Sequence, residues 1–183
     1  MPRIAVIGPG AIGATIAAYL SRNADVQLSI CARTPFEEIV LEAPAGTLRA
    51  SPPIYLEHKR ATIADWVIVA TKAYDNESVS AWLPHVADAA TRLAVLQNGV
   101  EHAERFHLTF DAFRILPTVI DLRSERIGPG HVRERRTGQS MSPIATKVVR
   151  SAICFRREAW MCARQKTSPR RPGANSVLIA PAR

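Results

Sequence analysis

The amino-acid sequence predicts an α/β protein with a doubly wound, mostly parallel sheet. Short apolar runs alternate with helical patterns through residues 1–138, and a glycine-rich segment separates the first run from the first helical pattern. The chain has 183 residues, of which 47% are hydrophobic. This length suffices for one domain with a core and is too short for two domains of full size.

The first half of this alternation predicts two strands and two helices before an irregular segment. Arg3–Ile7 is an apolar run typical of a buried strand, and Ala11–Leu20 repeats its apolar residues with the period of a helix. Residues 26–30 alternate between apolar and polar and predict a strand. Residues 36–41 are expected to form a short helix. A double proline interrupts residues 48–56, which predict a ragged hairpin or an edge strand.

The second half predicts three more strands and two more helices. Residues 66–70 form an apolar run of the kind buried in parallel sheets, and residues 93–96 and 113–116 are also expected to be strands. Asn76 or Ser78 is expected to cap a helix that carries four apolar residues on one face. Residues 101–108 predict a further helix.

The segment Gly8-Pro9-Gly10-Ala11-Ile12-Gly13 matches the GxGxxG pattern between the first strand and the first helix. In this pattern the first glycine makes a tight turn, the second lets the backbone approach a pyrophosphate, and the third allows close helix–strand packing. The helix N-terminus offers free N–H groups to phosphates. We therefore predict a dinucleotide site of the Rossmann type, and the alternative is a glycine-rich turn without a ligand.

The residue that follows the second strand indicates which nucleotide is bound. NAD-binding sheets place an acid about 20 residues after the glycine pattern, where it bonds the ribose 2′-OH. No acid occupies positions 31–33, and Arg33 stands there instead. A guanidinium pairs with a 2′-phosphate, so Arg33 predicts NADP over NAD. The alternative is a solvated arginine paired with Glu37 or Glu38.

Polar residues also follow two later strands. Thr71 and Lys72 come after residues 66–70, and Asn98 comes after residues 93–96. Ligands of such sheets bind outside the carboxyl ends of the strands. We therefore expect Lys72 to meet a phosphate or carboxylate, and Asn98 a ribose or carbonyl. The alternative for each is a capped strand end without ligand contact.

Five segments, MPRIAVIGPGAIGATIA, ICARTP, VIVATKAYD, LQNGVEH and PGHVRERRTG, together resemble the ketopantoate reductase (2-dehydropantoate 2-reductase) family over about residues 3–138. The resemblance implies that residues 8–13 cradle the pyrophosphate of NADPH and that Arg33 holds its 2′-phosphate. Lys72 would lie near the cofactor, and Asn98 would contact cofactor and substrate.

The family transfers hydride from NADPH to the ketone of ketopantoate, a small-molecule 2-oxo acid, giving pantoate for pantothenate and coenzyme A synthesis. The resemblance implies this activity for the gene. Two alternatives remain: a non-catalytic NADP(H)-binding module, and a reductase of another 2-oxo acid.

Residues 139–183 depart from that family. They contain nine basic residues and the single acid Glu158, whereas residues 1–138 contain fifteen basic and fifteen acidic residues, so the tail carries the entire net charge of +8. The family continues into a helical domain whose catalytic lysine follows a tryptophan and a basic residue. Here Met161-Cys162 follows Trp160, so we predict no catalytic residue.

We interpret residues 139–183 as a poorly ordered tail translated out of frame, with a frameshift near residues 138–144. Back-translation of residues 172–176 in a shifted frame permits the missing Trp-Arg-Lys-Leu segment. The chain is then truncated: an NADP-binding domain over 1–138 without reductase turnover. The alternative is a functional basic tail that binds RNA or an anionic surface, and we consider a nucleic-acid partner the weaker interpretation.

Other patterns exclude several classes. No run of about 18 apolar residues is present, so no membrane helix is expected. The odd, irregular set Cys31, Cys154 and Cys162 disfavours disulfides and zinc, and fits a reducing cytoplasm. The five histidines lack ligand spacing, so no metal is expected. Without the helical domain, one face of the sheet would be exposed, and we expect self-association through it.

Overall fold

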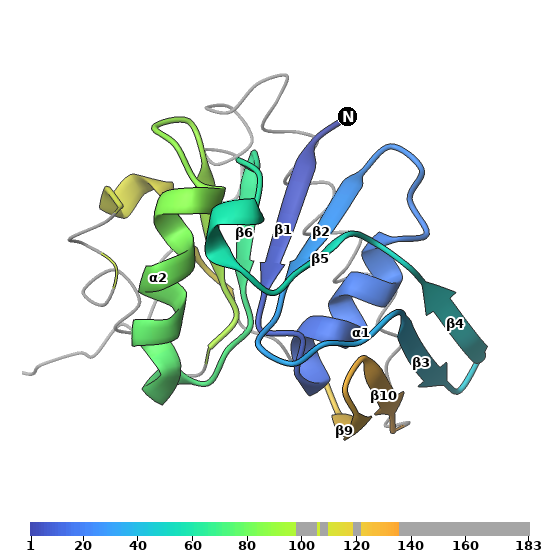
Figure 1. Ribbon diagram of the computed structural model, residues 1–183. Coiled ribbons are helices and arrows are strands. Elements are labelled where there is room, and N and C mark those ends of the chain that lie inside the picture. The colour runs from blue at the N-terminus through green and yellow to red at the C-terminus, as the bar shows by residue number, and fades with distance from the viewer. Residues whose placement is uncertain (98–105, 107–109, 119–121, 136–183) are drawn as a thin grey trace, which may run out of the picture.

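Figure 1 shows a computed structural model of the protein, which describes residues 1–97, 106, 110–118 and 122–135. The described residues form a six-stranded sheet with the order β5-β2-β1-β6-β7-β8, and a four-stranded sheet with the order β4-β3-β10-β9. Neither helix with described bounds is long and apolar enough to span a membrane.

All neighbours in the six-stranded sheet are parallel. Its strands are β1 (Arg3–Ile7), β2 (Gln27–Cys31), β5 (Ile54–Tyr55), β6 (Trp66–Val69), β7 (Arg92–Val95) and β8 (Ile115–Pro117). The helices with described bounds are α1 (Ala11–Leu20) and α2 (Asn76–Val86), together with the 3-10 helices η1 (His58–Arg60), η2 (Ala73–Asp75) and η3 (Ala112–Arg114).

The two α-helices cover opposite faces of this sheet (Figure 1). Along β1, Ile4 and Val6 belong to one hydrophobic cluster with α1, whereas Ala5 and Ile7 belong to a second cluster with α2. Successive side chains of a strand point to opposite faces, so both faces of β1 are buried. The predicted doubly wound, mostly parallel α/β fold is therefore confirmed.

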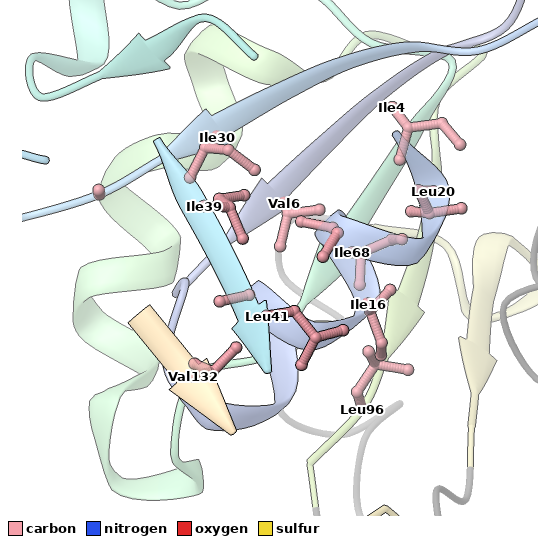
Figure 2. Packing of buried hydrophobic residues seen from close by; sticks show 14 of the residues in the cluster. Ile4, Val6, Ile16, Leu20, Ile30, Ile39, Leu41, Ile68, Leu96 and Val132 are labelled. Atoms are coloured by element: carbon pink, nitrogen blue, oxygen red, sulfur yellow. The ribbon is translucent and has the colours of Figure 1, made fainter. Parts of the chain in front are cut away.

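The smaller sheet was not predicted, and it covers the outer side of α1. It consists of β3 (Ile39–Ala43), β4 (Gly46–Ala50), β9 (Ser124–Gly128) and β10 (His131–Glu134). Its buried residues Ile39, Leu41 and Val132 join the cluster that also holds α1 and one face of the large sheet, as Figure 2 shows. Seven of the ten residues of α1 are buried, because the helix lies between two sheets.

Two polar contacts fasten α1 to the smaller sheet. The hydroxyls of Thr15 and Ser124 lie 3.0 Å apart, and Thr15 also donates to the carbonyl oxygen of Ala11 at 2.7 Å. The hydroxyl of Tyr19 donates to Glu134 Oε2 at 2.5 Å. Burial and the neighbouring carboxylate raise the pKa of Tyr19, so this hydroxyl remains a donor.

The prediction of a helix over residues 36–41 is wrong. This segment leads into β3, where the fully buried Ile39 and Leu41 alternate with the less buried Val40 and Glu42. This alternation is the two-residue period of a strand that packs one face on α1. The double proline separates two strands, since β4 forms a hairpin with β3 and β5 is the edge strand beside β2.

Two further boundaries differ from the predictions. The N-cap of α2 is Asp75, and neither Asn76 nor Ser78 caps it. The expected strand at 113–116 begins as η3 and becomes a strand at Ile115. Apart from Phe106, the helix expected at 101–108 lies outside the described residues, as does the tail from residue 136 onward.

Candidate cofactor site

A cavity of about 820 Å³ lies at the carboxyl ends of the central strands. Its lining includes Gly8 after β1, Arg33 after β2, Thr71 after β6 and Gln97 after β7. From β1 the sheet first grows through β2 and β5 on one side, and then through β6, β7 and β8 on the other side. The cavity lies at β1, where this strand order reverses. Ligands of open α/β sheets bind at this position.

The glycine turn has the geometry that its sequence pattern predicts. Gly8 has a φ of +86°, and a Cβ there would lie 2.6 Å from Thr71 Cγ2. A Cβ on Gly13 would lie 2.2 Å from the carbonyl oxygen of Gly8 and 3.0 Å from Ala70 Cβ, so α1 packs closely on the turn. A Cβ on Gly10 would instead meet no atom within 4 Å. Gly10 therefore leaves open space beside the backbone.

The N-terminus of α1 opens onto this cavity. Its N-cap is Gly10, which provides no side-chain acceptor, and the first turn of the helix contains no acidic residue. Pro9, Ala11 and Ile12 line the cavity. The uncapped N–H groups and the positive end of the helix dipole favour an anion at this position.

Arg33 forms an ion pair with Asp75, and both residues line the cavity. Its Nη2 lies 3.0 Å from Asp75 Oδ2, and its Nη1 lies 3.3 Å from Asp75 Oδ1. The Arg33 side chain is 73% exposed, whereas that of Asp75 is 21% exposed. The sequence-based alternative paired Arg33 with Glu37 or Glu38, but Glu38 pairs with Arg49 instead.

Lys72 lines the cavity and forms no ion pair with any residue that the structure describes. The loop that carries it is tied to the end of β7 by Gln97, which is only 5% exposed. Gln97 Nε2 donates to Thr71 Oγ1 at 3.0 Å, to the carbonyl oxygen of Lys72 at 3.3 Å and to Asn76 Oδ1 at 3.0 Å. Gln97 Oε1 is buried without a partner among the described residues.

Among the lining residues that the sequence analysis missed are Tyr74, Asp75, Gln97 and Arg126. Tyr74 and Asp75 directly follow the segment that contains Lys72, so their place in the chain was a usable signal. No sequence signal indicates Arg126, because β9 reaches the cavity only through the smaller sheet. The charged residues described in the lining are Arg33, Lys72, Arg126 and Asp75, which gives an excess of positive charge.

Of the predicted site residues, residues 8–12, Arg33, Thr71 and Lys72 line one cavity, and Gly13 packs against Gly8 in the adjoining turn. Asn98 lies outside the described residues. Cys31 also lines the cavity, but burial raises the pKa of its thiol to about 12, so the thiol is protonated at neutral pH. Within the described ranges, no three His, Cys, Asp or Glu side chains are grouped as metal ligands.

The chain resembles proteins of known family in sequence and in fold. A family model described as ketopantoate reductase PanE/ApbA matches residues 4–142. The chain is 41% identical over 144 residues to the 2-dehydropantoate 2-reductase of Caulobacter vibrioides, which covers 79% of this chain and 50% of that protein. It is 34% identical over 134 residues to the 2-dehydropantoate 2-reductase of Mycobacterium tuberculosis, with 72% and 45% covered.

Among solved structures, the crystal structure of 2-dehydropantoate 2-reductase from Geobacter metallireducens matches with a TM-score of 0.67 and 27% identity, covering 74% of this chain and 47% of that one. The chain thus spans about half the length of the curated relatives it matches. The matched range contains the glycine turn, Arg33, Lys72 and both sheets. The chain therefore belongs to the ketopantoate reductase PanE/ApbA family.

Proposed function

We propose that the cavity binds NADPH, and that the chain is the cofactor-binding part of a reductase that acts on a 2-oxo acid. The named relatives are 2-dehydropantoate 2-reductases, which makes 2-dehydropantoate the first substrate to test. The observation that carries the proposal is the glycine turn. Gly8 and Gly13 allow contacts that a Cβ would obstruct, while Gly10 leaves open space at an uncapped helix N-terminus.

The residues of the cavity fit a dinucleotide with three phosphate groups. The N–H groups of the first turn of α1 would bind the pyrophosphate, and Arg33 would pair with the 2′-phosphate. Lys72 and Arg126 add positive charge along the same lining. Asn98 would contact the ribose and the substrate. Bound NADPH would supply the hydride that reduces the ketone.

We further propose that residues 1–138 form the NADP-binding domain and that residues 139–183 take no part in it. The family match ends at residue 142, close to the point where the excess positive charge begins. Met161 and Cys162 follow Trp160, where the family's segment would have a basic residue and a lysine. The chain would then bind NADPH without appreciable turnover, as a non-catalytic NADP(H)-binding module does.

A substitution at Gly10 tests the binding proposal without disturbing the fold. Gly10 has a φ of −76°, which other residues adopt, and a Cβ there meets open space. Gly10→Val should lower the melting temperature of the full chain by only a few degrees, since valine is a poorer N-cap than glycine. It should weaken NADPH binding at least about tenfold, because the side chain fills the space needed by the pyrophosphate. Binding is measured by titrating the fluorescence of NADPH.

Gly128→Val is the matched control, since a Cβ on Gly128 also meets no atom within 4 Å and Gly128 does not line the cavity. It should bind NADPH as the unaltered chain does. Equal NADPH affinity of the Gly10→Val chain and the unaltered chain would contradict the proposed site. So would the absence of NADPH binding by the unaltered chain.

The catalytic part of the proposal has a separate test. NADPH oxidation is followed at 340 nm with 2-dehydropantoate and, in parallel, with pyruvate as a second 2-oxo acid. We expect no turnover of either. Turnover of 2-dehydropantoate would refute the proposal of a non-catalytic module, and turnover of pyruvate alone would favour a reductase of another 2-oxo acid.

We also propose that the chain self-associates. The sequence analysis expected an exposed face of the large sheet, but α1 and α2 cover both faces at β1, so we place the contact at the β8 edge instead. Phe113, in η3 just before β8, is 83% exposed, and Leu116 in β8 is also exposed. Exposed apolar side chains favour association. Sedimentation of the Phe113→Ser chain should show a smaller associated fraction than that of the unaltered chain, and an identical distribution would contradict the proposed surface.

A further inference from the structure

Asp75 places a carboxylate beside the guanidinium of Arg33, the side chain proposed above to pair with the 2′-phosphate. We propose that Asp75 is a specificity-determining residue, which lowers the preference of this site for NADPH over NADH. It does so by occupying Arg33 and by offering the ribose 2′-OH of NADH an acceptor. This inference rests on the proposed binding of a nicotinamide dinucleotide in the cavity.

The contact between the two side chains carries the first step. Both nitrogens at the tip of Arg33 contact Asp75, one with each carboxylate oxygen, at 3.3 and 3.0 Å. Asp75 is the less exposed partner, and both residues line the main cavity and an adjoining groove of about 520 Å³ that Tyr74 also lines. A phosphate that pairs with both terminal nitrogens of Arg33 must therefore replace the carboxylate of Asp75.

The position of Asp75 in the chain carries the second step. Asp75 is the N-cap of α2, a position where aspartate ordinarily accepts hydrogen bonds from the first turn of the helix. Here its side chain makes no capping hydrogen bond and contacts Arg33 instead. When a 2′-phosphate takes the guanidinium, the Asp75 carboxylate therefore loses its ion-pair partner. NADPH binding thus carries a cost at Asp75 that NADH binding does not.

The two cofactors meet this pair differently. The 2′-phosphate of NADPH carries negative charge to a position beside the Asp75 carboxylate, and like charges repel. The 2′-OH of NADH is a hydrogen-bond donor, and it bonds the carboxylate while the ion pair stays closed. Asp75 thus supplies, from the loop after β6, the acid that residues 31–33 lack at the end of β2.

The experiment compares NADPH and NADH binding by the unaltered chain and by Asp75→Asn. Asparagine has nearly the same shape and is also a favoured N-cap, so α2 keeps a capping residue. Removing one competing charge should raise the ratio of NADPH to NADH affinity about fivefold, the upper range for an exposed pair. The affinities come from fluorescence titrations of full-length protein at one ionic strength.

Asp111→Asn is the matched control. Asp111 also pairs with an arginine, Arg114, at 3.5 Å. Because Asp111 precedes β8, it lies at the amino ends of the strands, whereas the cavity lies at their carboxyl ends. Its affinity ratio should equal that of the unaltered chain. If Asp75→Asn fails to fold, Asp75→Ser, which keeps a capping hydroxyl, is measured by the same criterion.

The outcomes separate this inference from the proposed function. If the unaltered chain binds NADPH but the ratio in Asp75→Asn stays the same or falls, the inference is overturned and the binding proposal stands. If Asp111→Asn raises the ratio of NADPH to NADH affinity equally, the effect comes from the net charge of the chain, and the inference is overturned as well. If the unaltered chain binds neither dinucleotide, both proposals are overturned.

Discussion

Gln97 joins the end of β7 to the loop that carries Thr71 and Lys72, so replacing it tests how this side of the cavity is held. The substitution Gln97→Leu keeps the approximate size of the side chain and removes its amide. The Nε2 donor bonds the hydroxyl of Thr71, the carbonyl of Lys72 and the side chain of Asn76, all within 3.3 Å. All three lose this donor.

The magnitude follows from the number of hydrogen atoms and from burial. The amide nitrogen has two hydrogens, so it supports two of its three contacts at full strength, each worth about 1 kcal/mol. The three acceptor oxygens lose their donor next to a side chain that is only 5% exposed, which adds to this cost. Removal of the unpaired Oε1 offsets part of it. We expect the free energy of unfolding to fall by about 2 kcal/mol.

Urea unfolding followed by tryptophan fluorescence measures this change. Gln27→Leu is the control, because Gln27 is exposed in β2 and should change the free energy by at most about 0.5 kcal/mol. NADPH binding to Gln97→Leu should also weaken, since the loop with Lys72 loses its attachment. A loss no larger than that of the control, with unchanged NADPH affinity, would refute the reasoning.

Three further predictions follow from the structure. Gly13→Val places a Cβ 2.2 Å from the carbonyl oxygen of Gly8. The free energy of unfolding in urea should therefore fall by about 3 kcal/mol, or the chain should not fold. Native-like stability would contradict this packing. Hydrogen bonds from Arg133 and then His131 lower the pKa of Glu42, so its stabilising contribution is present above the unfolded-state pKa and is lost as the pH falls through the folded-state value. The stability difference between the unaltered chain and Glu42→Gln should therefore shrink from pH 7 to pH 3, and a constant difference would disprove the assignment. Cys31 is buried, and burial raises the pKa of its thiol to about 12. In a chain with Cys154→Ser and Cys162→Ser, Cys31 should therefore react with Ellman's reagent only as fast as the protein opens. Immediate reaction at pH 8 would contradict its burial.

The elements nearest the glycine turn could be predicted from sequence with their bounds. Arg3–Ile7 and Ala11–Leu20 have the predicted ends, because a buried strand, a glycine turn and an apolar helix are each defined by residues close together in the chain. The same local logic placed Arg33 and Lys72 at strand ends beside the cavity. In contrast, the sequence wrongly predicts a helix over residues 36–41, because a five-residue strand contains too few alternations to exclude the helical period.

The sequence by itself determined the family resemblance, the doubly wound order of elements and the glycine turn, because each depends on contiguous residues. Only the tertiary structure decided that β3 pairs in parallel with β10, that Arg126 reaches the cavity and that Asp75 pairs with Arg33. Asp75 and Arg33 are 42 positions apart. Such contacts depend on how distant segments pack around α1 and the central strands, and local propensity carries no information about that arrangement.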